Sequence, residues 1–523
     1  MKQLLLSFWI IASFWGCGSS SSPDTPQKQS DTEISGTKQD TPSPSQQPDT
    51  SFHEPVLTPD GVKDSLDQVK HDAENIVPID ETQTTEVVTQ PVVEAPKEHS
   101  VTVYIHGYDD KGTGYTNTYG YDAYDPMLNR LVALTGFDTL QTYDPSDFTD
   151  VITITPYYGQ KAPDYYTQKD RDEIKAVTDQ YGGGIPRYAL IVAKYARHVM
   201  EKTGAEHINF ISASMGSLIA RWIIEKDVEH LASQKKILRW KSLEGVIRGN
   251  KLASNSSLVK YADSIQKQPI DVAQMSYQWI EHNLHRPRSE AASSYYKDIT
   301  LSEVTSTKPG DPFDWLMLTT PNDGYQAVSD TYFASVLPQA RHNGMMPVHT
   351  FFHQTHLGLK KDDGAWANVA TFLLPHKRVR ITLRSAKVHD IHEYTYFLNK
   401  NAEIVFESRV FSPIVAEKWS ISDAISERVY DSGALPIHKY RKNGETKTFQ
   451  QLLYDDYVLK DETALKLTMA AYEVDWSLKY GIHEPGSRDS MGRATITLPL
   501  ANGTYRIEAE DWSGTIDVEV LEN

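Results

Sequence analysis

Cysteine is almost absent from this sequence, since Cys17 is the single cysteine among 523 residues. The chain beyond Cys17 therefore forms no internal disulfide and offers no thiolate ligands to a metal. The formal net charge is -18, and nothing in the sequence resembles a Lys/Arg-rich face that could neutralise nucleic-acid phosphates. No nucleic-acid partner is therefore expected.

Apolar runs long enough to cross a membrane are also lacking. The first apolar run, Leu4–Trp15, is short; it follows Lys2 and leads into small residues around Cys17. This pattern is typical of a secretory signal peptide and is too short for a spanning helix. The position of Cys17 resembles a bacterial lipoprotein signal, which implies that Cys17 is lipidated and anchors a secreted chain in a membrane. By the same resemblance, Gly18 favours the outer membrane or cell surface; ordinary secretion is the alternative.

The chain is too long for one hydrophobic core, and its texture predicts four regions. Residues 1–17 form the signal segment. Residues 18–98 are rich in Ser, Thr, Pro, Gln and acidic residues and carry more than half of the net negative charge. They bury too little apolar surface to offset their ordering entropy, which predicts a disordered tether. Residues 99–375 alternate strand and helix patterns, and residues 376–523 contain short alternating runs typical of a β-sandwich accessory domain.

The region 99–375 has the pattern of a parallel α/β sheet. Apolar strands are predicted over residues 101–105, 151–156 and 207–212. A helix is predicted over residues 185–203, with Pro186 in its first turn and Gly204 just after its end. Alternation of this kind requires right-handed crossovers that cover both faces of the sheet.

Ser214 is the candidate nucleophile, because the strand over 207–212 passes directly into a helical pattern at this residue. A sharp strand-to-helix turn exposes a side chain at the carboxyl edge of the sheet, where catalytic groups collect. Small residues must flank the serine. Gly216 meets this need, whereas Ser212 stands where the usual pattern has glycine. The alternative interpretation is a structural turn serine.

A serine nucleophile needs a base and a carboxylate that orients the base. A strand predicted over Trp315–Leu318 leads to a tight turn containing Asp323. A further strand, Val348–Phe352, leads to His356. Ser214, Asp323 and His356 thus follow one another in the chain order of the α/β-hydrolase arrangement, which differs from the two other familiar serine-protease orders.

Other residues near these strand ends leave alternatives open. Asp314 and Asp330 are the substitutes for Asp323. The competing histidines are His342, His349 and His353. Together with His356 they raise the possibility of a metal site, but zinc requires several imidazoles converging on one point. The prediction is therefore no metal and no cofactor.

Residues 100–374 resemble the lipase and esterase branch of the α/β-hydrolase superfamily. The motifs that carry the resemblance are YIHGY, SASMGSLIARW, TTPNDGYQAV and QTHLGLKKDDGAWANVATFL. The resemblance implies an α/β-hydrolase fold in which Ser214 is the nucleophile, His356 the base and Asp323 the orienting acid. It also implies an oxyanion hole formed by the backbone N–H groups of Tyr108 and Met215.

These observations predict a secreted, surface-anchored serine hydrolase that cleaves carboxylic esters, with lipid-like acyl chains favoured by the resemblance alone. A peptidase or amidase, an acyltransferase and a non-catalytic binding lipoprotein are the alternatives, and the oligomeric state is left open. Tyrosines after the strand ends predict a lid or an acyl-binding wall, or else ordinary loop packing: Tyr108, Tyr115, Tyr119, Tyr121, Tyr124, Tyr157, Tyr158, Tyr165 and Tyr166. Three acidic residues in predicted loops have the oxygen ligands that calcium prefers: Asp390, Glu393 and Asp475. The alternative is that they are solvent-exposed charges without a bound ion.

Overall fold

The computed structural model describes most of the chain beyond residue 98. The described residues are 99–109, 118–120, 126–146, 149–255, 260, 268–284, 294–308, 322–336, 346–391, 402–421, 426–428, 436–474 and 488–521. The expected signal segment with Cys17, the tether over 18–98 and the strand expected over Trp315–Leu318 lie outside them. Within the described residues, no helix combines the length and the apolar character that crossing a membrane requires.

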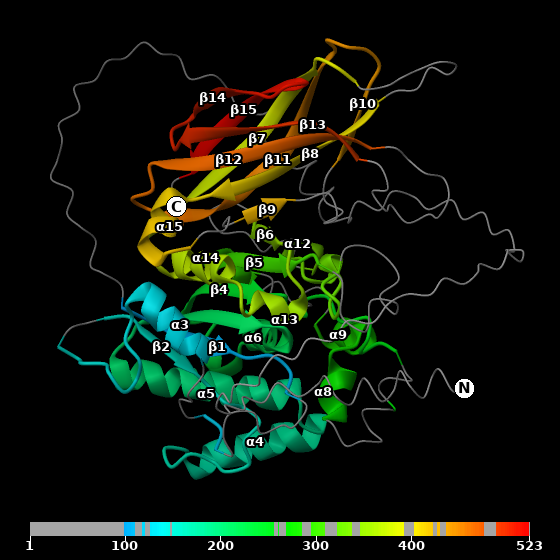
Figure 1. Cartoon of the computed structure of the whole chain (residues 1–523). Coiled ribbons are helices and arrows are strands. Elements are labelled where there is room, and N and C mark those ends of the chain that lie inside the picture. The colour runs from blue at the N-terminus through cyan, green and yellow to red at the C-terminus, as the bar shows by residue number, and fades with distance from the viewer. Residues whose placement is uncertain are drawn as a thin grey trace, which may run out of the picture.

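A six-stranded, wholly parallel sheet forms the centre of the first domain (Figure 1). Its strand order is β2-β1-β3-β4-β5-β6. The strands are β1 Ser100–Ile105, β2 Val151–Ile154, β3 His207–Ala213, β4 Ile237–Leu243, β5 Thr300–Ser306 and β6 Val348–Phe352. Helices cover both faces, which explains why the first three strands are nearly continuous in buried residues.

Two helical layers enclose this sheet (Figure 1). The helices α5 and α6 pack on one face with α4 outside them, whereas α3 and α14 lie together on the other face. The major helices are α3 Pro126–Thr135, α4 Gln168–Tyr181, α5 Ile185–Thr203, α6 Met215–Glu225 and α14 Asp363–Leu373. The shorter ones are η1 Val228–His230, α8 Pro269–Gln274, α9 Tyr277–Asn283, η2 Tyr296–Asp298, η3 Val328–Asp330, α12 Phe333–Val336 and α13 His356–Leu359.

The residues that predicted the bounds of α5 lie at the two ends of the helix in the structure. Pro186 lies in the first turn, where its missing N–H leaves no hydrogen bond unmade, and Gly204 ends the helix in a left-handed conformation with φ 73°. The parallel sheet, its crossover helices and the sharp turn between β3 and α6 confirm the predicted α/β-hydrolase fold class.

The C-terminal region forms two antiparallel sheets that face each other, as the alternating sequence pattern predicted (Figure 1). One sheet has the order β10-β8-β12-β13, with β9 paired to β8, and the other has the order β11-β7-β15-β14. The strands are β7 His376–Val388, β8 Ala402–Phe411, β9 Ser426–Arg428, β10 Ile437–Tyr440, β11 Thr446–Leu459, β12 Ala464–Val474, β13 Arg488–Pro499, β14 Gly503–Glu508 and β15 Trp512–Leu521, and α15 spans Pro413–Trp419. Buried side chains from both sheets form one core.

The β-sandwich is joined to the first domain by buried polar contacts. Arg378 of β7 is 1% exposed and donates to Asp455 of β11 at 2.6 and 2.8 Å and to the carbonyl of Met346 at 2.7 Å. Asp456, also 1% exposed, accepts a hydrogen bond from Asn368 of α14 at 2.7 Å and another from the hydroxyl of Thr350 in β6. The two domains therefore share a desolvated interface.

Candidate active site

Ser214 occupies the turn between β3 and α6 in a backbone conformation that side chains seldom adopt, with φ 51° and ψ -122°. Its N–H donates to the carbonyl of Leu243 at 2.9 Å, and its carbonyl accepts from the N–H groups of Ser217 and Val246 at 3.1 Å. Strain of this size persists only where the surroundings fix the backbone. The half-buried Ser214 side chain is thereby held at the carboxyl edge of the sheet.

Close packing around the turn explains the small residues beside Ser214. A Cβ atom at Gly216 would lie 2.3 Å from the carbonyl oxygen of Ile105 and 2.5 Å from that of His106, so a larger residue would push α6 off β1. Ser212 is accommodated where the usual pattern has glycine, because its hydroxyl lies 2.9 Å from the Ser217 hydroxyl and accepts from the Trp240 indole at 2.8 Å.

The structure brings Ser214, His356 and Asp323 together, as the sequence predicted. His356 begins α13, and its Nε2 lies 3.2 Å from Oγ of Ser214. Its Nδ1 lies 2.8 Å from Oδ2 of Asp323. An ionised carboxylate only accepts hydrogen bonds, so Nδ1 carries the proton and Nε2 is left to accept the Ser214 hydroxyl. This arrangement suits an imidazole that removes the hydroxyl proton.

Asp323 is held rigidly for this contact. It is fully buried, and its Oδ1 accepts from the N–H groups of Tyr325 and Gln326 at 2.9 and 2.7 Å. Its carbonyl accepts the N–H of His356 at 3.0 Å, which ties the start of α13 to the same turn. The carboxylate is therefore left with one oxygen, Oδ2, for the imidazole.

The charges around His356 change its affinity for a proton. Burial acts to lower the pKa of His356, but the carboxylates of Asp323 and Glu244 outweigh burial and raise the pKa to about 9. Only the neutral imidazole can accept a proton from the Ser214 hydroxyl, so the fraction of His356 able to do so falls as the pH drops through this raised pKa.

We therefore expect the kcat/KM of any reaction in which His356 takes a proton from Ser214 to rise with pH along a limb whose midpoint lies above 6.5, the ordinary histidine value, and near 9. Initial rates at substrate concentrations far below KM, measured from pH 5 to pH 10, check this expectation. A midpoint at or below 6.5 would show that the two carboxylates do not control the base.

The strand end that follows β1 lies against Ser214. A Cβ atom at Gly107 would meet Cβ of Ser214 at 3.0 Å. The Gly107 carbonyl accepts from Nδ1 of His106 at 2.8 Å and from the Tyr157 hydroxyl at 3.0 Å. The C=O and N–H of one trans peptide unit point in opposite directions, so these bonds also fix the direction of the Tyr108 N–H. Met215, the other predicted donor, is the first residue of α6, where helix N–H groups have no intrahelical acceptor.

Most of the described tyrosines near this edge pack in the core. Tyr157 and Tyr158 are almost fully buried, and the Tyr157 ring stacks on His106 at 4.1 Å between centroids. Burial lowers the pKa of His106 to about 3, so its ring is neutral. Tyr119 and Tyr166 are buried too. Ordinary packing thus accounts for these four residues, whereas Tyr115, Tyr121 and Tyr124 lie outside the described residues.

The alternative acids and bases occupy other positions. Asp330 accepts a hydrogen bond from the Tyr277 hydroxyl at 2.5 Å and lies in η3. His349 pairs through Nδ1 with Glu303 at 2.5 Å. Asp314 and His342 lie outside the described residues, as do Glu393 and Asp475 among the proposed calcium ligands.

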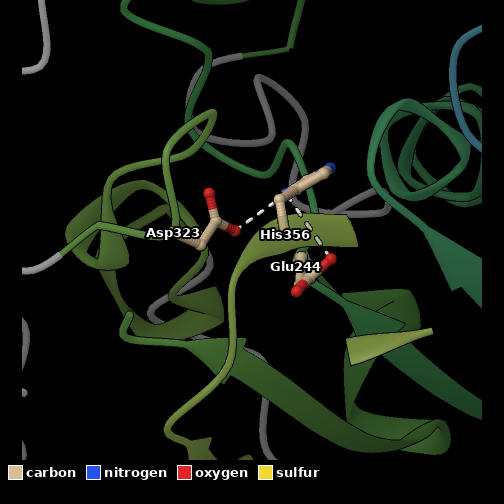
Figure 2. Close-up of side chains that lie close together, drawn as sticks. All are labelled: Glu244, Asp323 and His356. Carbon is tan, nitrogen blue, oxygen red and sulfur yellow. Dashed lines mark hydrogen bonds and ion pairs between the residues drawn. The ribbon is translucent and has the colours of Figure 1, made fainter. Parts of the chain in front are cut away.

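Glu244 is a residue of the site that the sequence analysis did not identify. It directly follows β4, and its Oε2 lies 3.4 Å from Nδ1 of His356 (Figure 2). The available signal was its position, because Glu244 directly follows β4, which runs parallel to β3 and ends at the same sheet edge. Glu244 also lines a small pocket together with Tyr104 and Leu359.

Among the described residues, one group is close enough together to be considered as a metal site. It consists of Glu244, Asp323 and His356, whose ligand atoms all lie within 4.8 Å of one another. The separation of Nδ1 and Asp323 Oδ2 is 2.8 Å. Two ligands of one tetrahedral zinc ion would lie about 3.3 Å apart, given metal–ligand bonds of about 2.0 Å. The spacing thus fits a hydrogen bond between His356 and Asp323 better than shared coordination.

Comparison with known proteins gives no family. No family model matches the sequence, and no curated protein matches it. Among solved structures, the chain is similar to the mature form of a lipase from Bacillus licheniformis, with 14% identity, 52% of this chain and 91% of that chain covered, and a TM-score of 0.32. A carboxyl esterase from the fungus Tuber melanosporum has 11% identity, covers 53% of this chain and 76% of its own, and gives a TM-score of 0.27. A C2 domain is similar to 28% of this chain over 99% of its own length, with 9% identity and a TM-score of 0.16.

Identities and TM-scores this low carry no argument about activity. Ser214 follows β3, His356 follows β6, and Asp323 lies in the segment before η3. Their side chains form a continuous path from the Ser214 hydroxyl through the imidazole to a buried carboxylate.

Proposed function

We propose that this protein is a serine hydrolase that cleaves carboxylic esters through an acyl-enzyme on Ser214. The observation that carries the proposal is the pair of contacts made by His356, 3.2 Å from the Ser214 hydroxyl and 2.8 Å from Asp323. A hydroxyl is a weak nucleophile by itself, and an adjacent oriented base is what activates it.

The reaction proceeds in two transfers of the acyl group. Ser214 Oγ attacks the ester carbonyl carbon while its proton passes to Nε2 of His356. The carbonyl oxygen becomes an oxyanion, which the N–H groups of Tyr108 and Met215 stabilise, each such donor contributing about 3 kcal/mol to the transition state. The intermediate then expels the alcohol, which takes the proton from His356.

The second transfer releases the acid. A water molecule gives its proton to Nε2 of His356 and attacks the acyl carbon, and the carboxylic acid leaves as Ser214 recovers its proton. Asp323 keeps its charge throughout and stabilises the imidazolium that forms twice. Esters are the assigned class, and lipid-like acyl chains follow from the sequence resemblance alone. Comparing kcat/KM over a series of p-nitrophenyl esters of increasing acyl length would define that preference.

A fluorophosphonate probe tests the proposal, because it phosphonylates only a serine that is already activated. Wild type should be labelled at one site per chain, and the Ser214→Ala variant should not be labelled. The Ser212→Ala variant is the matched control, since Ser212 lies two residues earlier, in β3, and its hydroxyl accepts a hydrogen bond from the Trp240 indole. Failure of wild type to react would favour a binding protein instead, and labelling of Ser214→Ala would place the nucleophile elsewhere.

We also propose that the chain is an outer-membrane or cell-surface lipoprotein held in the membrane through Cys17. The support is the sequence around Cys17, where an apolar run leads to small residues. Cells supplied with radioactive palmitate should yield labelled protein for wild type and unlabelled protein for Cys17→Ala. Equal labelling of the two chains would refute the anchor.

A further inference from the structure

A second carboxylate reaches the imidazole of His356 from a different strand. Glu244 follows the last residue of β4 in a left-handed conformation with φ 50°, and its N–H donates to the carbonyl of Val304 in β5 at 2.8 Å. This backbone turn aims the side chain at the carboxyl edge of the sheet. There Oε2 lies 3.4 Å from Nδ1 of His356, while Oε1 accepts a hydrogen bond from the Ser306 hydroxyl.

The two carboxylates approach the ring from separate elements (Figure 2). Asp323 is the nearer, at 2.8 Å from Nδ1, and receives the hydrogen bond, whereas Glu244 lies just outside hydrogen-bonding distance. Both acids are almost inaccessible to water, at 0% and 2% exposure. A small shift of the ring or of either acid would therefore exchange one acceptor for the other.

Burying a carboxylate beside another one is unfavourable unless a cation or a donor compensates. Burial raises the pKa of Glu244 above its usual range, and the charge of Asp323 adds to this, while His356 and Lys360 act in the opposite direction. The Ser306 hydroxyl is a further donor to the carboxylate. The charge on Glu244 is thus favoured chiefly when the neighbouring imidazole is positively charged.

We propose that Glu244 is a second positioning residue for the base, able to accept the Nδ1–H of His356 in place of Asp323. The inference rests on the proposed function, in which His356 is the base. Because Glu244 also lies beside the ring, the His356 tautomer with its proton on Nδ1 does not depend on Asp323 alone. The site then has two acids for one imidazole.

Three purified full-length variants test this role: Asp323→Asn, Glu244→Gln and the double variant. In a site with one acid, exchanging that acid for its amide lowers kcat by about 10⁴-fold. Here Asp323→Asn should lower kcat by only about 10²-fold, Glu244→Gln by less than about tenfold, and the double variant by about 10⁴-fold, all with little change in KM. Both substitutions preserve side-chain shape, and the thermal unfolding midpoint of each variant verifies that it folds.

Glu303→Gln supplies the matched control. Glu303 is also a buried glutamate at the sheet, and it pairs with His349 instead of His356. The double variant that carries Asp323→Asn and Glu303→Gln should have the same kcat as Asp323→Asn alone. A comparable extra loss with this control would mean that any buried glutamate has the same effect, and it would overturn the assigned role.

A pH profile separates positioning from a merely structural role. The charge of Glu244 contributes to the raised pKa of His356, together with that of Asp323 and against that of Lys360. The acidic limb of kcat/KM should therefore move to lower pH in Glu244→Gln and stay in place in Glu303→Gln. An unmoved limb in Glu244→Gln would contradict the inference.

Two outcomes distinguish this inference from the proposed function. If wild type reacts with a fluorophosphonate but Asp323→Asn alone already loses about 10⁴-fold in kcat, the hydrolase stands and the role of Glu244 falls. Equal kcat in Asp323→Asn and the double variant would have the same meaning. If wild type does not react at all, both proposals fail.

Discussion

Replacing Ser214 with alanine should lower kcat for a short-chain ester by about a millionfold, and replacing His356 with alanine should have a similar effect. The double variant should fall little further, because the hydroxyl and the imidazole act as one unit across their 3.2 Å contact. The residual rate would come from the oxyanion donors and substrate binding. Initial rates with a chromogenic ester, measured over six decades of enzyme concentration, provide the comparison.

His353 offers a matched control for the histidine substitution. It is half-buried, three residues before His356, in the segment between β6 and α13. His353→Ala should keep kcat within a few fold of wild type, because no step of the mechanism passes through it. Near wild-type turnover in His356→Ala would mean that another group removes the Ser214 proton.

Removing residues 376–523 should prevent the first domain from folding, which is the second large effect we expect. The deletion removes β11, which contacts β6 and α14, and β7, which contacts α14. It also exposes the ring of Phe372, which packs against Tyr457 at 5.4 Å between centroids. Trp419 of α15, whose indole donates to the carbonyl of Leu134 in α3 at 2.9 Å, would be lost as well.

Electrostatics at the interface point to the same result. Lys241 is fully buried in β4 near Asp456, donates to the Ser302 hydroxyl at 2.8 Å, and has its pKa lowered by burial to about 8. Asp456 is the acidic group that counteracts this lowering. Soluble yield, near-ultraviolet circular dichroism and ester turnover of the shortened chain measure the outcome. A soluble chain with wild-type turnover would make the β-sandwich dispensable for folding.

A pair of point variants tests the interface without deleting a domain. Asp455→Ala leaves the buried guanidinium of Arg378 without its carboxylate partner and should reduce the free energy of unfolding by about 3–5 kcal/mol. Glu508→Ala breaks the pair between Arg506 and Glu508, whose side chains are 69% and 62% exposed, and should cost less than about 1 kcal/mol. Urea unfolding of both variants gives the comparison, and equal losses would contradict a structural interface.

The nucleophile turn could be predicted from the sequence because its requirements are local. An apolar strand, small residues and an amphipathic helix, all between His207 and Glu225, suffice to place Ser214 at the edge of a sheet. Asp323 and His356 could be predicted from chain order, since each follows a strand or a tight turn in the expected succession.

The strand β5 was missed because its residues are polar. Ser302, Glu303, Thr305 and Ser306 are all buried, although a buried parallel strand is normally recognised by its apolar residues. Their partners come from other elements, including Lys241 and His349 for the first two, and such pairings are not visible in a single sequence. Hydrophobic periodicity fails where buried polar groups satisfy one another.

Glu244 was missed for a related reason. Its contact with His356 joins residues more than a hundred positions apart, and the turn that directs it has a left-handed backbone that glutamate rarely adopts. The long strand β11 was missed too, because its Gln, Asp and Thr residues break the alternation that identified its neighbours. Long-range contacts of both kinds emerge only with the folded chain.

Mass spectrometry of the phosphonylated protein identifies the serine that reacts. After reaction with a fluorophosphonate and digestion, we expect the adduct on Ser214, in the peptide that joins β3 to α6, and we expect it to form more slowly at low pH, where His356 is protonated. An adduct on any other serine, or a wild-type chain that stays unmodified, would contradict the assignment of Ser214 as the nucleophile.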